Sequence, residues 1–313
     1  MKRIVSILAV LAVLLTSLVA LASCGGATTT TGEENSAPAT SEGTSTSEGT
    51  STGGNNGGKI TIGIPNDTTN EARALLLLES LGYIELDPAA GITATIRDIT
   101  KYNKNIQFVE LEAAQLPLKR AEFDYAVINT NYAVEAGLNP KTDSLAIEGS
   151  ASAYGNILVV KEGNEETAKT KALIAALSSK QVADFISTKY AGNVVGIVEN
   201  PGDGYDASLN YEELKGATIT VAASPVPHAE ILEIAKTILA EKEITLDIRE
   251  FNDYIVPNNV VESGEIDANY FQHVPYLNDF NLENGTHLVS VLAVHVEPMG
   301  LYGGKQTNLD ALN

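Results

Sequence analysis

The fold is decided by the stretch KITIGIPNDTTNEARALLLLESLG at residues 59–82. Lys59 to Ile64 alternates apolar and polar side chains as a strand does, and turn-forming and N-capping residues follow at 65–70. Glu71 to Ser80 is then a leucine-rich helix, which Gly82 stops. The stretch therefore predicts one strand–loop–helix unit.

The same order recurs later in the chain. Thr218 to Ala222 is a second predicted strand, 223–227 a loop, His228 to Lys242 a helix and Thr245 to Glu250 another strand. In addition, residues 122–129 and 264–271 each place an acidic turn before a short strand and a helix. We therefore predict an α/β chain of two lobes, in the type II-like architecture of periplasmic binding proteins, with a ligand cleft between the lobes at the carboxyl ends of the strands.

Composition restricts the possible partners. The 313 residues include 20 Lys and Arg against 40 Asp and Glu, a formal net charge of −20. This excess of acid argues against nucleic-acid binding and against a polybasic membrane patch. Cys24 is the one cysteine, so an intrachain disulfide, a Cys-based zinc site and an iron–sulfur cluster are excluded. We expect small-molecule or protein partners and no cofactor.

The first residues have the pattern of an export signal. Lys2 and Arg3 precede an apolar run from Ile4 to Ala20, and small residues stand directly before Cys24. Leu21-Ala22-Ser23-Cys24 resembles the lipobox of bacterial lipoproteins, which implies a signal peptide at 1–23 and lipidation of Cys24, with the protein anchored by its acyl chains on the extracytoplasmic face of the cell membrane. A transmembrane anchor is the alternative, but the apolar run is shorter than the roughly 20 residues needed to span a bilayer.

Residues 24–58 are predicted to be a disordered tether. They are dominated by Ser, Thr and Gly, and the hexamer at 40–45 is repeated at 46–51. Such a composition cannot bury a core. Treated as a Gly/Ser coil, the segment reaches roughly 30 Å, enough to hold a domain off the membrane surface.

Several side chains are candidates for holding a ligand. Arg73 falls in the first turn of the predicted helix, where the helix dipole favours an anion, and it can pair with a carboxylate in bidentate fashion. A solvated helix arginine is the alternative. Asn129 and Asn156 end or adjoin apolar runs and can both donate and accept, which suits a zwitterion, although strand-end capping explains them as well. Tyr254, Phe271, His273 and Tyr276 form an aromatic cluster that half-buried packing would also explain.

Five motifs carry a resemblance to a known family. They are FNDY at 251–254, DANYFQHVPYL at 267–277, PNDTTNEARALLLL at 65–78, VELEAAQLP at 109–117 and AVINTNYA at 126–133. Together they resemble the NlpA lipoprotein family, the methionine-binding proteins of ABC importers. The resemblance covers nearly all of 59–190 and 217–313.

The motifs stand in a different order from that of the family, whose members begin with the segment resembling 217–313 and continue into the one resembling 59–190. The chain therefore resembles a circular permutation, in which residues 191–216 form a linker between the family's usual ends. A truncated or rearranged tandem gene is the alternative. The permuted arrangement predicts lobe A from 59–150 plus 300–313 and lobe B from 154–296.

The resemblance also implies residue roles. Arg73 would bind the carboxylate of methionine, and Asn129 and Asn156 would form hydrogen bonds with the polar end of the same ligand. Tyr254, Phe271 and His273 would surround the thioether side chain. The residues at 152–156 and 295–299 differ from those usual in the family, so the resemblance does not define the shape of the pocket.

The resemblance implies a substrate-binding lipoprotein that captures L- or D-methionine, or a close analogue, and delivers it to an ABC permease and its ATPase. The alternatives are a surface lipoprotein of the same fold with an adhesion or signalling role, and a binding protein for another small amino acid or peptide. An enzyme is not expected, because His228, His273, His287 and His295 lack metalloprotease spacing and no nucleophile elbow is present.

Overall fold

The strand, loop and helix predicted at 59–82 are present in the computed structural model, which describes residues 58–149 and 154–313. β1 (Ile60–Pro65) leads into α1 (Thr68–Ser80). The helix begins earlier than Glu71 because Asp67 caps it, accepting a hydrogen bond of 3.0 Å from the backbone N–H of Asn70. The predicted signal peptide, Cys24 and all but the last residue of the tether lie outside the described residues.

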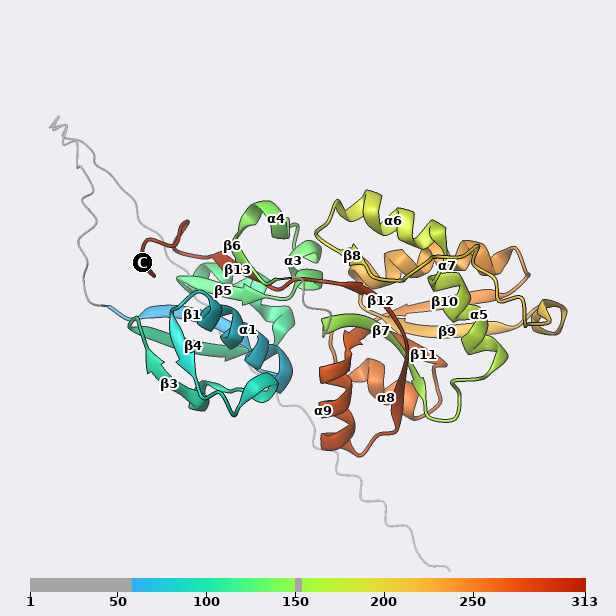
Figure 1. The fold of residues 1–313 in the computed structure, drawn as a ribbon, viewed down its shortest axis with the longest axis horizontal. Coiled ribbons are helices and arrows are strands. Elements are labelled where there is room, and N and C mark those ends of the chain that lie inside the picture. The colour runs from blue at the N-terminus through green and yellow to red at the C-terminus, as the bar shows by residue number, and fades with distance from the viewer. Residues whose placement is uncertain (1–57, 150–153) are drawn as a thin grey trace, which may run out of the picture. The chain divides into compact units, whose positions relative to one another are not determined.

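A mixed five-stranded sheet contains β1 (Figure 1). Its strand order is β4-β1-β5-β13-β6, with β1, β4 and β5 parallel and β13 antiparallel to both of its neighbours. The other strands are β4 (Ile106–Leu111), β5 (Tyr125–Ile128), β13 (Gly300–Gly303) and β6 (Ser144–Ile147). The carboxyl ends of β1 and β5 therefore meet at one edge of this sheet.

A six-stranded sheet has the order β10-β9-β11-β7-β12-β8. β9, β10 and β11 are parallel, whereas β7 is antiparallel to β11 and β12. The strands are β10 (Thr245–Glu250), β9 (Thr218–Ala223), β11 (Ala268–His273), β7 (Gly155–Lys161), β12 (Leu288–Val296) and β8 (Val195–Gly196). The predicted repeat is thus confirmed, since β9, β10 and β11 follow the pattern of β1, β4 and β5.

One polar contact explains why an acidic turn precedes a strand in both halves. Asp124 accepts hydrogen bonds from the backbone N–H and the hydroxyl of Thr61, each at 2.8 Å. Asp267 accepts the equivalent bonds from Thr220, at 2.8 and 3.0 Å. Each aspartate therefore fixes the register of a strand against its parallel neighbour.

Helices cover both sheets. The α-helices are α1, α2 (Leu116–Lys119), α3 (Thr130–Glu135), α4 (Pro140–Asp143), α5 (Ala168–Leu177), α6 (Lys180–Tyr190), α7 (Glu230–Ala240), α8 (Val256–Glu262) and α9 (Val274–Asn284). The shorter elements are β2 (Ile84–Leu86), β3 (Ile99–Tyr102) and the 3₁₀ turns η1 (Gly91–Thr93), η2 (Ile96–Asp98), η3 (Ala113–Gln115), η4 (Arg120–Glu122) and η6 (Tyr211–Leu214). The largest core cluster packs α5, α6 and α7 against the six-stranded sheet.

The start of the helix predicted from His228 was wrong. A π-helical turn, η7 (Pro225–Ala229), precedes α7, and the backbone N–H of Ala229 donates to the carbonyl of Ser224 at 3.0 Å. Val226 has an extended backbone (φ −129°, ψ 135°) because the residue before a proline is disfavoured in the α conformation, so the turn is not a regular α-helical one. As a result, His228 is held in the turn and not on the helix, with only 1% of its surface exposed.

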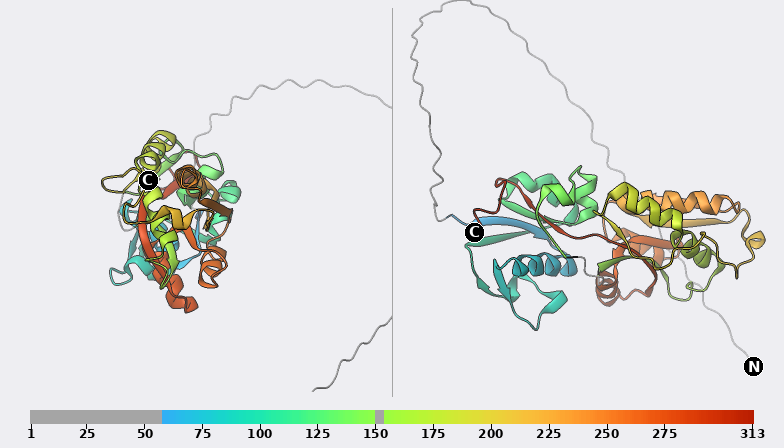
Figure 2. Two further views of the ribbon diagram at one scale, coloured as in Figure 1. Left: turned by 90° about the vertical axis from the view of Figure 1, so that its right-hand side faces the viewer. Right: turned by 45° about the horizontal axis from the view of Figure 1, so that its top comes forward.

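The carboxyl end of the chain packs on the five-stranded sheet. The chain runs from β12 in the six-stranded sheet into β13 in the other, as Figures 1 and 2 show. Leu312 is fully buried in the same core cluster as β1 and α1. The Lys104 Nζ donates to the carbonyl of Asn313 at 2.5 Å, while the backbone N–H of Ile60 donates to the carbonyl of Asn105 at 2.8 Å. The end of the chain and the start of β1 therefore share neighbouring contacts.

Candidate functional site

A single pocket collects all six ligand-binding residues predicted from the sequence. About 350 Å³ in the pocket and at its mouth, open solvent included, is not filled by protein atoms. Its first wall comes from α1 and from the end of β5, and its second wall from the six-stranded sheet and the segments beside it. The first wall consists of Asn70, Arg73, Asn129, Thr130 and Asn131. The second wall consists of Asn156, Tyr254, Phe271, Gln272, His273, Tyr276 and Glu297.

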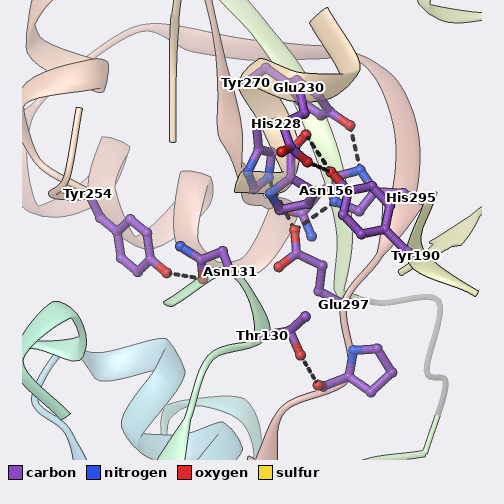
Figure 3. A network of polar contacts seen from close by, with 12 residues as sticks. Thr130, Asn131, Asn156, Tyr190, His228, Glu230, Tyr254, Tyr270, His295 and Glu297 are labelled. Atoms are coloured by element: carbon purple, nitrogen blue, oxygen red, sulfur yellow. Dashed lines mark hydrogen bonds and ion pairs between the residues drawn. The ribbon is translucent and has the colours of Figure 1, made fainter. Parts of the chain in front are cut away.

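The walls touch each other directly. The Tyr254 hydroxyl donates to Asn131 Oδ1 at 2.8 Å, and Arg73 Nη2 donates to the main-chain carbonyl of Glu297 at 2.8 Å. The Thr130 hydroxyl donates to the carbonyl of Pro298 (Figure 3). These bonds connect residues that are far apart in the sequence, so the pocket depends on the two sheets being assembled together.

Arg73 is buried and already has an anionic partner. Its Nε lies 3.0 Å from Glu148 Oε1, and its Nη2 lies 2.6 Å from Glu148 Oε2. The guanidinium also stacks on Tyr154, with 4.3 Å between Arg73 Cζ and the ring centre. Among the hydrogen bonds formed within 58–149 and 154–313, none uses Arg73 Nη1. A ligand carboxylate would therefore use Nη1 or displace Glu148.

Amide groups of the first wall have unused hydrogen-bonding capacity. Asn129 donates through Nδ2 to Asn70 Oδ1 at 2.8 Å. Its own Oδ1 has no partner among the described residues, and neither has Asn131 Nδ2. Because a buried polar atom without a partner costs about 1–3 kcal/mol, a polar ligand that paired with both atoms would stabilise this wall. This is the arrangement that a zwitterion requires.

The second wall supplies aromatic surface. The Tyr254 and Phe271 rings stack with 5.7 Å between centres, and the Tyr276 hydroxyl donates to the carbonyl of Tyr254 at 2.9 Å. His273 caps α9 by accepting at Nδ1 from the backbone N–H of Tyr276. Burial lowers the pKa of His273 well below its ordinary value, so the imidazole is neutral at pH 7. The aromatic cluster is thus fixed by hydrogen bonds and presents an apolar face.

A buried polar cluster behind the second wall was not predicted from the sequence. Glu297 Oε1 lies 2.6 Å from His295 Nε2 and 3.3 Å from His228 Nε2. The Tyr270 hydroxyl bonds His295 Nδ1, and His228 Nε2 lies 2.9 Å from Asn156 Oδ1 (Figure 3). His295 and Glu297 stand two residues apart at the end of β12, so the alternation of a strand, which places them on one face, was the available signal.

The side chains of this cluster have shifted acidities. Burial lowers the pKa of His228 and of His295 to about 3, so both imidazoles are neutral at pH 7. Burial raises the pKa of Glu297, and His228, Arg73 and the Asn131 backbone N–H oppose that rise. The cluster therefore contains one carboxyl group and two uncharged rings.

Three side chains of this cluster are of the types that bind metal ions. Ligand atoms of His228, His295 and Glu297 all lie within 4.8 Å of one another. The 2.6 Å separation of His295 Nε2 from Glu297 Oε1 is a hydrogen-bond length. Two ligands of a tetrahedral zinc ion, each about 2.0–2.1 Å from the metal, stand about 3.3 Å apart. The geometry fits a proton between these atoms and does not fit a shared metal ion.

The two sheets and the pocket lined from both define the fold class, which is the mixed α/β fold of periplasmic binding proteins. The chain belongs to the NlpA lipoprotein family, whose model matches residues 56–198 and 219–313. No helix within 58–149 or 154–313 has the length and apolar character required to cross a membrane.

Individual relatives match over part of their length. The membrane lipoprotein TpN32 of Treponema pallidum is 46% identical over 134 residues, which are 43% of this chain and 50% of that protein. The methionine-binding lipoprotein MetQ of Bacillus subtilis is 38% identical over 44% of this chain and 52% of its own. A nutrient binding protein of Burkholderia cenocepacia, solved with bound methionine, is 40% identical with a TM-score of 0.42, over 42% of this chain and 56% of its own. The chain spans about half the length of the curated relatives it matches.

Proposed function

We propose that this chain is the substrate-binding lipoprotein of an ABC importer and that it binds methionine or a close analogue. The observation that carries the proposal is the convergence of Arg73, Asn129 and Asn156 with the aromatic wall in one pocket. Unpaired amide atoms and the guanidinium suit the polar end of an amino acid, and the stacked rings suit an apolar side chain. The relative in Bacillus subtilis is a methionine-binding lipoprotein, which supports this choice of ligand.

The proposed cycle is capture followed by delivery. A buried zwitterion needs each of its charges paired, and groups from both walls pair them only when the walls are in contact. The bonds from Tyr254 to Asn131 and from Arg73 to Glu297 are such contacts. The closed protein, held at the extracytoplasmic face of the membrane through Cys24, would then dock on a permease driven by its ATPase.

Titration calorimetry on the full-length chain in detergent tests the proposal. Bound ligand is first removed by unfolding and refolding, and L-methionine, D-methionine and methionine sulfoxide are then titrated separately. We expect saturable heat with at least one of them. The absence of heat with all three, from protein shown by circular dichroism to be folded, would overturn the assignment of the ligand.

The pocket also bears on the alternative of an adhesion or signalling lipoprotein. Such a protein would need neither a small-ligand pocket nor a buried arginine in its wall. Arg73 is only 5% exposed and lines the pocket, which supports ligand binding over a purely surface role.

A further inference from the structure

The two halves of the molecule also meet outside the pocket. Lys141 lies in α4, which leads into β6 of the five-stranded sheet, and residues 191–193 join α6 to β8 of the six-stranded sheet. The Lys141 Nζ donates to the carbonyl of Ala191 at 2.6 Å, and the Lys141 backbone N–H donates to Asn193 Oδ1 at 3.0 Å. Lys141, Ala191 and Asn193 are not among the residues that line the pocket. The contact therefore joins the two halves without reaching the ligand.

The acceptor of the lysine is the end of a helix. α6 ends at Tyr190, and Ala191 is its C-cap, with a left-handed backbone (φ 47°). The last carbonyl groups of a helix have no partner within the helix, and the helix dipole places partial negative charge there. An ammonium group at this position is therefore held both by a charge-assisted hydrogen bond and by the field of the helix.

The turn after α6 has the shape that the ammonium group needs. Gly192 also has a left-handed backbone (φ 86°), and a Cβ atom at this position would lie 2.5 Å from Lys141 Nζ. Asn193 follows and accepts from the first turn of α4, where Asn139 Oδ1 accepts from the same N–H at 3.0 Å. Each helix end thus receives a polar group from the opposite half of the molecule, an ammonium at the end of α6 and an amide oxygen at the start of α4.

We infer that Lys141 is a positioning residue that holds the two walls of the pocket in contact and so slows the release of the ligand. This inference rests on the proposed function and deepens it, because it places one determinant of ligand retention outside the pocket. Both bonds of Lys141 join the two halves, so an opening of the pocket breaks them. An interaction made only in the closed form stabilises that form, and it lowers the rate of release more than it changes the rate of capture.

The rate of ligand release measures this role. The full-length chain in detergent is loaded with radiolabelled methionine of the enantiomer that the titration shows to bind, and loss of the label is followed after excess unlabelled methionine is added. Lys141→Met keeps the length of the side chain and removes its charge. We expect release to be about fivefold faster and association to be unchanged. Lys141→Arg should restore the slow release, and Lys119→Met, the same change at an exposed lysine of α2, should release methionine at the wild-type rate.

The outcomes are distinguishable. If wild type retains no label, the proposed function fails before Lys141 is tested. Release from Lys141→Met at the wild-type rate would overturn the inference. So would faster release that Lys141→Arg fails to restore, or a urea midpoint of ligand-free Lys141→Met well below that of wild type, because the lysine would then be structural. If Lys141→Met does not fold, Asn193→Ala decides, since it removes the second bond and should release methionine about twofold faster, and an unchanged rate would overturn the inference.

Discussion

The two walls of the pocket differ in how their charges are balanced. In the first wall Arg73 is neutralised by Glu148, and amide atoms of Asn129 and Asn131 are unpaired. In the second wall Glu297 is surrounded by neutral rings and has no basic partner within the described residues. The first wall therefore suits the anionic end of a ligand and the second its cationic end.

Removing the guanidinium should have the largest effect. Arg73→Ala deletes the cation of the first wall and leaves the half-buried Glu148 carboxylate with the backbone N–H of Met299 as its remaining partner. We expect methionine affinity to fall on the order of 100-fold or more, measured by titration calorimetry. Arg97→Ala removes an exposed arginine of η2 and is the matched control, which should retain wild-type affinity.

A second variant separates binding from folding. Glu148→Gln keeps the shape of the partner but removes its charge, which frees the guanidinium for a ligand carboxylate. If Arg73 binds the ligand, this variant should bind methionine at least as tightly as wild type. A loss as large as that of Arg73→Ala would mean that the ion pair serves only to hold the wall together.

The second wall should make stability depend on pH. Burial lowers the pKa of His228 and His295 to about 3, whereas in the unfolded chain each takes up a proton near pH 6.5. Their contribution to stability is therefore complete above pH 6.5 and is lost as the pH falls toward 3, by up to about 1.4 kcal/mol per pH unit for each ring. Glu297, whose pKa burial raises, opposes part of this loss.

Urea denaturation between pH 7.5 and 5.0 measures that dependence. We expect the midpoint of wild type to fall with pH, and His228→Gln to show a shallower fall because one proton acceptor is removed. His287→Gln changes a histidine whose side chain is 66% exposed, so its pH profile should match wild type. Identical profiles for all three proteins would contradict the neutral state assigned to the buried rings.

Much of this site could be predicted from the sequence, but the partner of Arg73 and the role of Glu297 could not. Turn and capping residues after apolar runs placed Arg73 on the helix that follows one strand and Asn129 at the end of another, and the carboxyl ends of parallel strands bring such side chains together. The pairing of Arg73 with Glu148 could not be anticipated, because 75 residues separate the two and sequence patterns report only local contacts. For Glu297, the sequence showed only that residues 295–299 differ from those usual in the family. Its role depends on His228, which packs against it from another element.

The aromatic part of the second wall should contribute a smaller share. Phe271 is buried against Tyr254 and would contact the thioether side chain. Phe271→Leu keeps the site apolar while removing part of the ring surface, so we expect a loss of about tenfold in methionine affinity. Competition with norleucine is a further check, because Phe271→Leu should lower the affinity for norleucine and for methionine by the same factor. An unchanged affinity would place the side chain of the ligand elsewhere in the pocket.

The smallest effect is expected from changing the order of the chain. We propose that this protein is a circular permutation of its family, because relatives align over only about half their length and the family model matches the chain in two pieces, 56–198 and 219–313. The carboxyl end also shares contacts with the start of β1, through Lys104 and Asn105. In the predicted linker at 191–216, β8 extends the six-stranded sheet and Tyr205 packs on Lys242, so the segment has structure of its own.

A variant with the family order restored tests this proposal, with residues 217–313 placed first and 59–198 joined after them. Both walls are then made from the same residues, so we expect methionine affinity to stay within about twofold of wild type, and stability to fall modestly because residues 199–216 are missing. A matched version with a short Gly/Ser linker at the junction controls for strain there. If neither version folds, the two ends do not occupy equivalent places, and the swapped order reflects a rearranged gene and not a permutation.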